Sequence, residues 1–198
     1  MRASWACGLV LYAGCAAAFA VDPFAQPLTA AVVRTQMAQL MPEMDRAQVL
    51  RGRFTQRKFL VELPRPLVST GEFILLRGQG LHWRTLQPLE SEVLLTVSPT
   101  SSPSATAVFL ALFAIDIDAL AERFDFFGDV AGPAWQLGLR PRDAGLATRV
   151  EKALLVGRSS VERIVLYEAG GDRTDIALEA VAQRVDQLTD GERKRLAP

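Results

Sequence analysis

The chain has few residues that could perform covalent or metal chemistry. Its 198 residues include one histidine and two cysteines, and both cysteines, Cys7 and Cys15, lie within the first twenty positions. A chain cut after Ala20 would have no thiol, which excludes a disulfide, a cysteine nucleophile and a thiolate metal site. Because His82 would then have only carboxylates as co-ligands, we expect no metal site and no cofactor.

An enzyme is also disfavoured by the surroundings of the single histidine. His82 stands between Leu81 and Trp83 in an apolar run, so in a strand it faces away from both neighbours and toward solvent. A catalytic histidine needs a nucleophile in a supporting turn, and the sequence contains no G-x-S-x-G motif. We therefore predict a protein without catalytic activity.

The chain has no excess of charge of either sign. Lysine and arginine number 22, as do aspartate and glutamate, and removal of residues 1–20 would take away one arginine and no acid. The remaining 21 bases and 22 acids give a net charge of about −1, which offers no electrostatic reason to bind nucleic acid or anionic lipid. We read the basic end, residues 191–198, as a solvated tail.

Residues 1–20 have the features of a cleavable secretory signal. Arg2 precedes an uncharged apolar run, and Ala18-Phe19-Ala20 forms an A-x-A cleavage site before Val21. The run is too short to span a membrane. We expect an exported protein whose residues 21–198 form one domain. The alternative is a lipoprotein signal ending in Tyr-Ala-Gly-Cys, with Cys15 acylated and holding the protein on a membrane.

Two segments have helical periodicity. Residues 27–41 place Val33, Met37, Leu40 and Met41 on one face until Pro42 interrupts. Residues 107–127 repeat phenylalanine and leucine at spacings of three and four, and their first half is apolar nearly all round. Such a helix either lies deep in a core or closes over an apolar ligand.

Short apolar or alternating runs predict antiparallel strands. Before the second helix they span residues 52–60, 68–76, 80–86 and 91–98, and after it 134–139, 152–157, 160–168 and 173–181. Thr189 and Glu192 form a T-x-x-E capping pattern for a short closing helix. The sequence thus predicts an α+β domain of seven or eight antiparallel strands with two apolar helices.

A specific motif lies in the first strands. Its elements are Phe54-x-Gln56, then Gly71-Glu72-Phe73, Arg77, Leu81-x-Trp83 and Pro88. This spacing resembles the N-terminal half of the LolA family, periplasmic carriers of outer-membrane lipoproteins. The likeness is strong over residues 50–90 and loose from there to residue 181.

The resemblance implies a curved antiparallel sheet that forms an open half-barrel, with helices acting as a lid over an apolar concave face. Acyl chains of lipoproteins or related lipids would lie there during transfer to the outer membrane. It also implies a monomer in the periplasm, with an inner-membrane exporter and an outer-membrane acceptor as partners. The sheet and the helices would then enclose an apolar hollow that no side chain of the protein fills. The expected lipid-binding residues are Met37, Met41, Phe54, Phe73, Leu75, Trp83, Phe109 and Phe113.

By the same resemblance, Arg77 holds the lid through hydrogen bonds to helix backbone. A guanidinium beside apolar Phe73 and Leu75 must find carbonyl or carboxylate partners, and the carbonyls at a helix end are suitable. The alternative is a strand-end arginine that stacks on Trp83 and faces water.

Two departures from the family pattern keep other functions open. Gly78 replaces a proline after the arginine, and residues 98–106 replace an aromatic hairpin. The alternatives are a membrane-anchored acceptor of the LolB kind lipidated at Cys15, a LolA-like carrier for a non-lipoprotein product of an export pathway, and a structural module with a dry packed core.

Overall fold

The computed structural model describes residues 22–96, 105–183 and 187–196. The segment expected to be a signal, with Cys7 and Cys15, lies outside these residues, as do positions 97–104 of the loop after the fourth predicted strand.

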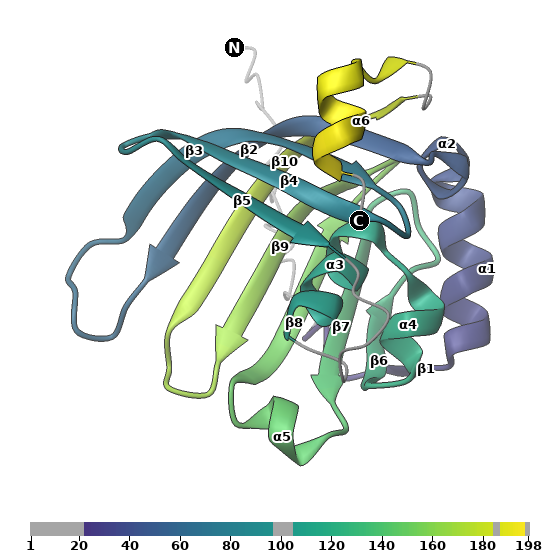
Figure 1. The fold of residues 1–198 in the computed structure, drawn as a ribbon. Helices are drawn as coiled ribbons and strands as arrows, with labels where there is room; N and C mark the ends of the chain where they lie inside the picture. The colour runs from purple at the N-terminus through teal and green to yellow at the C-terminus, as the bar shows by residue number, and fades with distance from the viewer. Residues whose placement is uncertain (1–21, 97–104, 184–186, 197–198) are drawn as a thin grey trace, which may run out of the picture.

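One antiparallel sheet of ten strands forms the body of the described chain (Figure 1). The strands lie side by side in the order β1 (Pro27–Leu28), β6 (Phe124–Asp129), β7 (Trp135–Pro141), β8 (Val150–Gly157), β9 (Val161–Glu168), β10 (Arg173–Gln183), β2 (Val49–Phe59), β3 (Leu67–Leu76), β4 (Gly80–Gln87) and β5 (Ser91–Thr96). Because β1 and β5 stand at opposite ends of this order, the sheet is open. The predicted α+β class and the open curved sheet are therefore confirmed.

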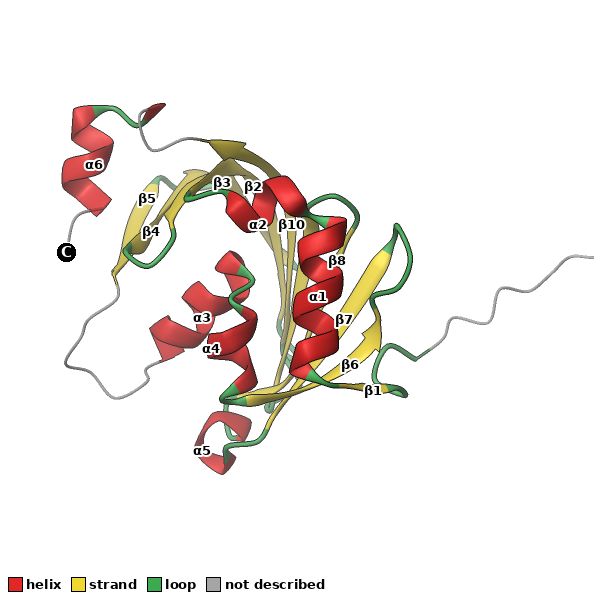
Figure 2. Ribbon diagram, turned by 90° about the vertical axis from the view of Figure 1, so that its right-hand side faces the viewer, coloured by secondary structure: helices red, strands yellow, loops and turns green. Residues whose placement is uncertain are grey.

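Helices lie on both faces of the curved sheet. Figure 2 shows α3 (Ala105–Ala114) and α4 (Ile117–Ala121) inside the curve, and α6 (Asp190–Leu196) outside it. The other helices are α1 (Ala30–Leu40), α2 (Pro42–Arg46) and α5 (Ala144–Ala147). Residues of α1, α3 and α4 share one apolar core cluster with the concave side chains of the sheet.

The first helix begins and ends where local chemistry requires. Thr29 caps α1 by accepting a hydrogen bond from the backbone N–H of Val32, at 3.3 Å. Pro42 cannot continue α1 and instead occupies the first turn of α2, where no backbone N–H is needed. At the other end of the chain, Thr189 and Glu192 exchange the two hydrogen bonds of a capping box, at 2.8 and 3.3 Å, as predicted.

The predicted helix over residues 107–127 is too long. Its final residues form strand β6, in which Phe124 and Phe126 face the core and alternate with exposed Asp125 and Asp129. A period of two over so few residues is hidden by the regular spacing of the phenylalanines. The remaining helix is broken at Ile115, whose φ of +49° ends α3 before Asp116 caps α4.

Candidate functional site

Five aromatic rings meet on the concave face. Phe54 and Trp83 are stacked with their centroids 3.6 Å apart, and Phe113 of α3 stands edge-on to Trp83 at 5.3 Å and to Phe73 at 6.2 Å. Phe109, one turn before Phe113, lies 4.6 Å from it. These contacts join strands β2, β3 and β4 to the lid helix.

All eight residues predicted to bind lipid belong to the apolar core cluster that contains these rings. Seven are buried, and Phe109 is half-buried against the others. Met37 and Met41 reach it from α1, and Leu75 from β3. The structure thus brings the predicted residues together, while their role toward lipid stays a prediction.

Gly71 of the motif makes the ring stack possible. Gly71 pairs with Phe54 across β2 and β3, and a Cβ atom at this position would clash with the carbonyl oxygen of Arg84 and lie 2.7 Å from the Phe54 ring. Only glycine leaves room for the ring to lie across the strand and reach Trp83. The spacing of Phe54, Gly71 and Trp83 therefore encodes one packing unit.

Among the described residues, the cavity under α3 is much smaller than the expected hollow. The cavity there measures about 20 Å³ and is bounded by Met44, Leu50, Phe73, Arg77, Phe113, Ile115, Val161, Leu178 and Ala180. Phe113 packs its ring edge-on against both Phe73 and Trp83, so side chains of the chain itself occupy this part of the concave face. Under Phe113 the concave face is therefore covered by α3 itself, because an all-round apolar helix can bury itself there.

Arg77 connects the end of β3 to two helices. Its guanidinium donates hydrogen bonds to the carbonyl oxygen of Ala114, the last residue of α3, and to that of Met44 in α2, the latter at 2.9 Å. Burial lowers the pKa of Arg77, while the nearby carboxylates of Asp45 and Asp116 raise it. The contacts are those expected for a lid-holding arginine: a half-buried cation paired with helix-end carbonyls.

The turn after Arg77 explains the departure from the family pattern. Gly78 has a φ of +72°, a value that proline cannot adopt, and Gln79 donates its backbone N–H to Leu76 at 3.1 Å. Arg77 itself is fixed by its backbone N–H, which donates to the carbonyl of Gln48 at 2.9 Å. This chain therefore positions the arginine with a glycine turn and a link to the start of β2.

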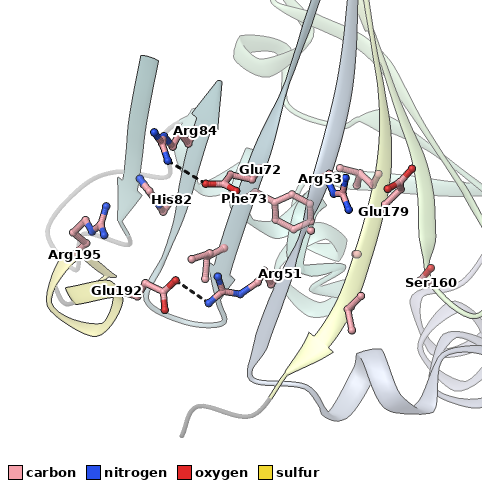
Figure 3. A pocket seen from close by; sticks show the side chains of 15 residues that line it. Arg51, Arg53, Glu72, Phe73, His82, Arg84, Ser160, Glu179, Glu192 and Arg195 are labelled. Carbon is pink, nitrogen blue, oxygen red and sulfur yellow. Dashed lines mark hydrogen bonds and ion pairs between the residues drawn. The ribbon is translucent and has the colours of Figure 1, made fainter. Parts of the chain in front are cut away.

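A larger groove of about 580 Å³ lies on the convex face beside α6 (Figure 3). Arg51 and Glu192 pair across it at 2.8 Å, and Arg84 lies 3.4 Å from Glu72. His82 lines the same groove and is only 12% exposed, so it faces away from the core but is less solvated than predicted. Its Nε2 stands 3.6 Å from a carboxylate oxygen of Glu92.

Two features are not found among the residues that the structure describes. These residues contain no group of three or more histidine, cysteine, aspartate and glutamate side chains placed to hold a metal ion. None of the described helices has the length and apolar character needed to cross a membrane.

Comparison with known proteins gives likenesses of structure. No family model and no curated protein matches the chain. A LolA superfamily protein from Nitrosomonas europaea matches 83% of this chain and 96% of its own, at 10% identity and a TM-score of 0.44. The chain resembles LolA superfamily proteins in fold. A Vibrio parahaemolyticus outer membrane lipoprotein-sorting domain matches 79% of the chain and 94% of its own, at 11% identity and a TM-score of 0.37.

A third similar structure is the complex of MucA and MucB from Pseudomonas aeruginosa, at 19% identity and a TM-score of 0.40. The match covers 82% of this chain and 62% of that one. At these identities and TM-scores the likenesses carry no argument about function.

Proposed function

We propose that this protein is a carrier that shields acyl chains of lipoproteins or related lipids, without catalytic activity, while they pass through the periplasm to the outer membrane. The observation that supports it is the covering of an apolar, aromatic concave face by a helix that is itself apolar on nearly every side. Under this proposal, the described conformation is the closed, unloaded one, with α3 in the place that the cargo would take.

Exchange of α3 for an acyl chain is energetically feasible. Each CH₂ group removed from water contributes about 0.8 kcal/mol, so a sixteen-carbon chain supplies on the order of 10 kcal/mol before ordering costs. The rings of Phe73 and Trp83 keep apolar partners in both states. Phe109 and Phe113 cover them in one state, and the acyl chain covers them in the other. The polar cost of opening is then the loss of Arg77's bonds to helix carbonyls, each worth about 1.5–3 kcal/mol for a charged donor.

Export, location and partners are part of the same proposal. They follow from the signal pattern of residues 1–20 and from the motif of residues 50–90. A monomeric carrier would receive its cargo from an inner-membrane exporter and deliver it to an outer-membrane acceptor. A binding equilibrium that a few hydrogen bonds can shift suits both steps, because each partner need only compete for the contacts of the lid.

A membrane-anchored acceptor is the second candidate, since Tyr-Ala-Gly-Cys ends at Cys15. Mass spectrometry of the mature N-terminus separates the two: a free Val21 supports the soluble carrier, and a diacylglyceryl group on Cys15 supports the acceptor. A carrier for another hydrophobic export product is favoured by the changed segment at residues 98–106, and the identity of a co-purified lipid would reveal it.

Native mass spectrometry of protein purified from the periplasm tests the carrier function. We expect bound lipid on the wild type and none on Phe113→Asp, because a carboxylate at the centre of the ring cluster opposes an acyl chain. Leu94→Asp is the matched control, since Leu94 is 46% exposed and pairs with His82 on the convex face. Lipid-free wild type that also fails to displace a fluorescent fatty acid would contradict the proposal and favour a dry structural module.

A further inference from the structure

A second cavity, of about 370 Å³, follows the seam between the first two helices and the turn from α3 to α4. Its size falls within the usual range of small-ligand sites. Methionines of α1 and α2 face isoleucines of the α3–α4 turn across it: Met37, Met41, Met44, Ile115 and Ile117. Unbranched, polarisable methionine side chains adapt to ligands of varied shape, so this wall suits a flexible aliphatic chain.

The seam cavity adjoins the small cavity beneath α3. Met44, Arg77 and Ile115 line both, so these three residues form the partition between them. The hydrogen bonds of Arg77 to Met44 and Ala114 cross this partition. Release of the bond to Ala114 would therefore join the seam to the space occupied by Phe113.

An exposed ion pair links the two sides of the seam. Arg34 of α1 binds Asp118 of α4, and their side chains are 51% and 75% exposed. Exposed pairs of this kind stabilise a contact only weakly and are screened by salt. Parting the seam therefore breaks only a weak ion pair, although it also separates the buried side chains of Met37, Met41 and Ile117.

The rim of the seam is more acidic than basic. Asp45, Asp116 and Asp118 line it with Arg34 and Arg77, which leaves a net charge of −1. Arg34 pairs with Asp118, and Arg77 donates to carbonyls while its charge also interacts with the nearby carboxylates of Asp45 and Asp116. A cationic group is thus attracted to the rim, and a phosphate or carboxylate is repelled.

We propose that this seam is the entry site for the carrier's cargo, and that it binds a single aliphatic chain bearing an amine head group. The aliphatic chain of the ligand lies among the methionines, and its amine lies at the Asp45 end of the rim. The proposal rests on the proposed carrier function, because it assigns the path by which an acyl chain reaches the aromatic cluster.

The head-group preference can be measured with simple amphiphiles below their micellar concentrations. Dodecylamine, dodecanoic acid and dodecyl phosphate are titrated against the full chain at low salt, with displacement of a fluorescent fatty acid as the readout. Dodecylamine should bind about two- to five-fold more tightly than either anion, the range expected for one partly exposed charge contact. Equal or tighter binding of the anions would overturn the head-group assignment.

Paired variants test the position of the amine. Asp45→Lys should remove the preference for dodecylamine, whereas Glu43→Lys should keep it, because Glu43 lies on the same helix but does not line the seam. Loss of the preference in both variants would show a long-range charge effect and contradict a site at the rim.

A bulky side chain tests the path itself. Met44→Trp should slow the association of dodecylamine at least several-fold, and Val181→Trp, an exposed position on the convex groove, should leave it unchanged. If Met44→Trp binds at the wild-type rate while Phe113→Asp binds nothing, the carrier function stands and the seam is the wrong entry. If the wild type binds none of the probes, both proposals fail.

Discussion

The two faces of strand β3 are covered in different ways. Phe73 and Leu75 point into the concave cluster under α3, while Ile74 and Leu76 point outward and form a small cluster with Val49, Leu188 and Leu196 under α6. Both helices cover apolar side chains of the same strand. The side-chain alternation of a strand thus creates two apolar surfaces, and the cover of each decides what the surface can do.

The difference between the covers lies in their polar contacts. α6 is tied down by its capping box and by the ion pair of Glu192 with Arg51, whereas the contact from the sheet to the end of α3 is the hydrogen bond from Arg77 to Ala114. An apolar helix held by few hydrogen bonds can leave its place when another apolar group, such as an acyl chain, covers the same surface. We therefore regard α3 as the exchangeable cover and α6 as the fixed one.

The largest loss of stability is expected at Gly71, where the packing on the concave face leaves no room for an added methyl group. Gly71→Ala would press a methyl group against the backbone carbonyl of Arg84 and the Phe54 ring, and should lower the free energy of unfolding by about 3 kcal/mol. Gly170→Ala is the control, because no atom lies within 4 Å of a Cβ built there. Urea denaturation compares the two, and equal midpoints would contradict the assigned role of Gly71.

Removal of the arginine should loosen one cover and not the other. Arg77→Leu should speed hydrogen exchange in α3 at least ten-fold while α6 is unaffected, since a charged hydrogen bond contributes about 1.5–3 kcal/mol. Arg53→Leu, on the convex groove, serves as the matched substitution. If α3 exchanges equally fast in all three proteins, Arg77 does not hold it.

Acid should weaken the attachment of α6 and leave that of α3 unchanged. Burial tends to raise the pKa of Glu192, but the hydrogen bonds from Thr189 and Arg51 dominate, and the pKa lies below its usual 4.5. A depressed pKa means that this carboxylate stabilises α6 above pH 4.5 and that the contribution is lost as the pH falls through the lower, folded-state pKa. The end of α3 is held by a guanidinium that keeps its charge in acid.

The signals of Leu196 and Phe113 in NMR spectra follow these changes. As the pH falls from 6 to 3.5, the chemical shift of Leu196 should move toward its value in an unfolded chain before that of Phe113 does. Glu192→Gln should remove this difference. A simultaneous change at both sites would show that the covers are not independent.

The smallest effect is expected at the Arg34–Asp118 pair. Arg34→Glu should cost about 0.5 kcal/mol of stability and speed dodecylamine uptake about two-fold, because like charges would face each other across the seam. Exchange of the two charges, Arg34→Asp with Asp118→Arg, should restore the wild-type rate. Stopped-flow fluorescence measures it, and an unchanged rate in Arg34→Glu would mean that the pair does not limit entry.

The sequence contained enough information for the sheet and the ring cluster. Alternation and turn residues placed nearly all of the strands, and the spacing of Phe54, Gly71 and Trp83 marked the packing unit at their centre. These features are local or follow from strand pairing, so a single sequence can express them. The two-residue strand β1 is too short to have a pattern, and β6 was hidden by helix-like spacing.

The filling of the concave side of the sheet could not be predicted from the sequence. Whether Phe113 lines a hollow or fills it depends on how deeply α3 inserts, which is decided by contacts with residues far away in the chain. The seam cavity likewise combines α1, α2 and the α3–α4 turn, and the left-handed conformation of Ile115 that shapes it has no sequence signal. Only the assembled structure shows these features.

The central claim is that an aliphatic chain can take the place of α3 against the aromatic face. Intermolecular NOEs between dodecylamine and the isotope-labelled protein test it most directly. We predict NOEs from the chain's methylene protons to the rings of Phe73 and Trp83, together with loss of the contacts between those rings and Phe113. NOEs confined to the convex groove, with the contacts of Phe113 intact, would contradict the account.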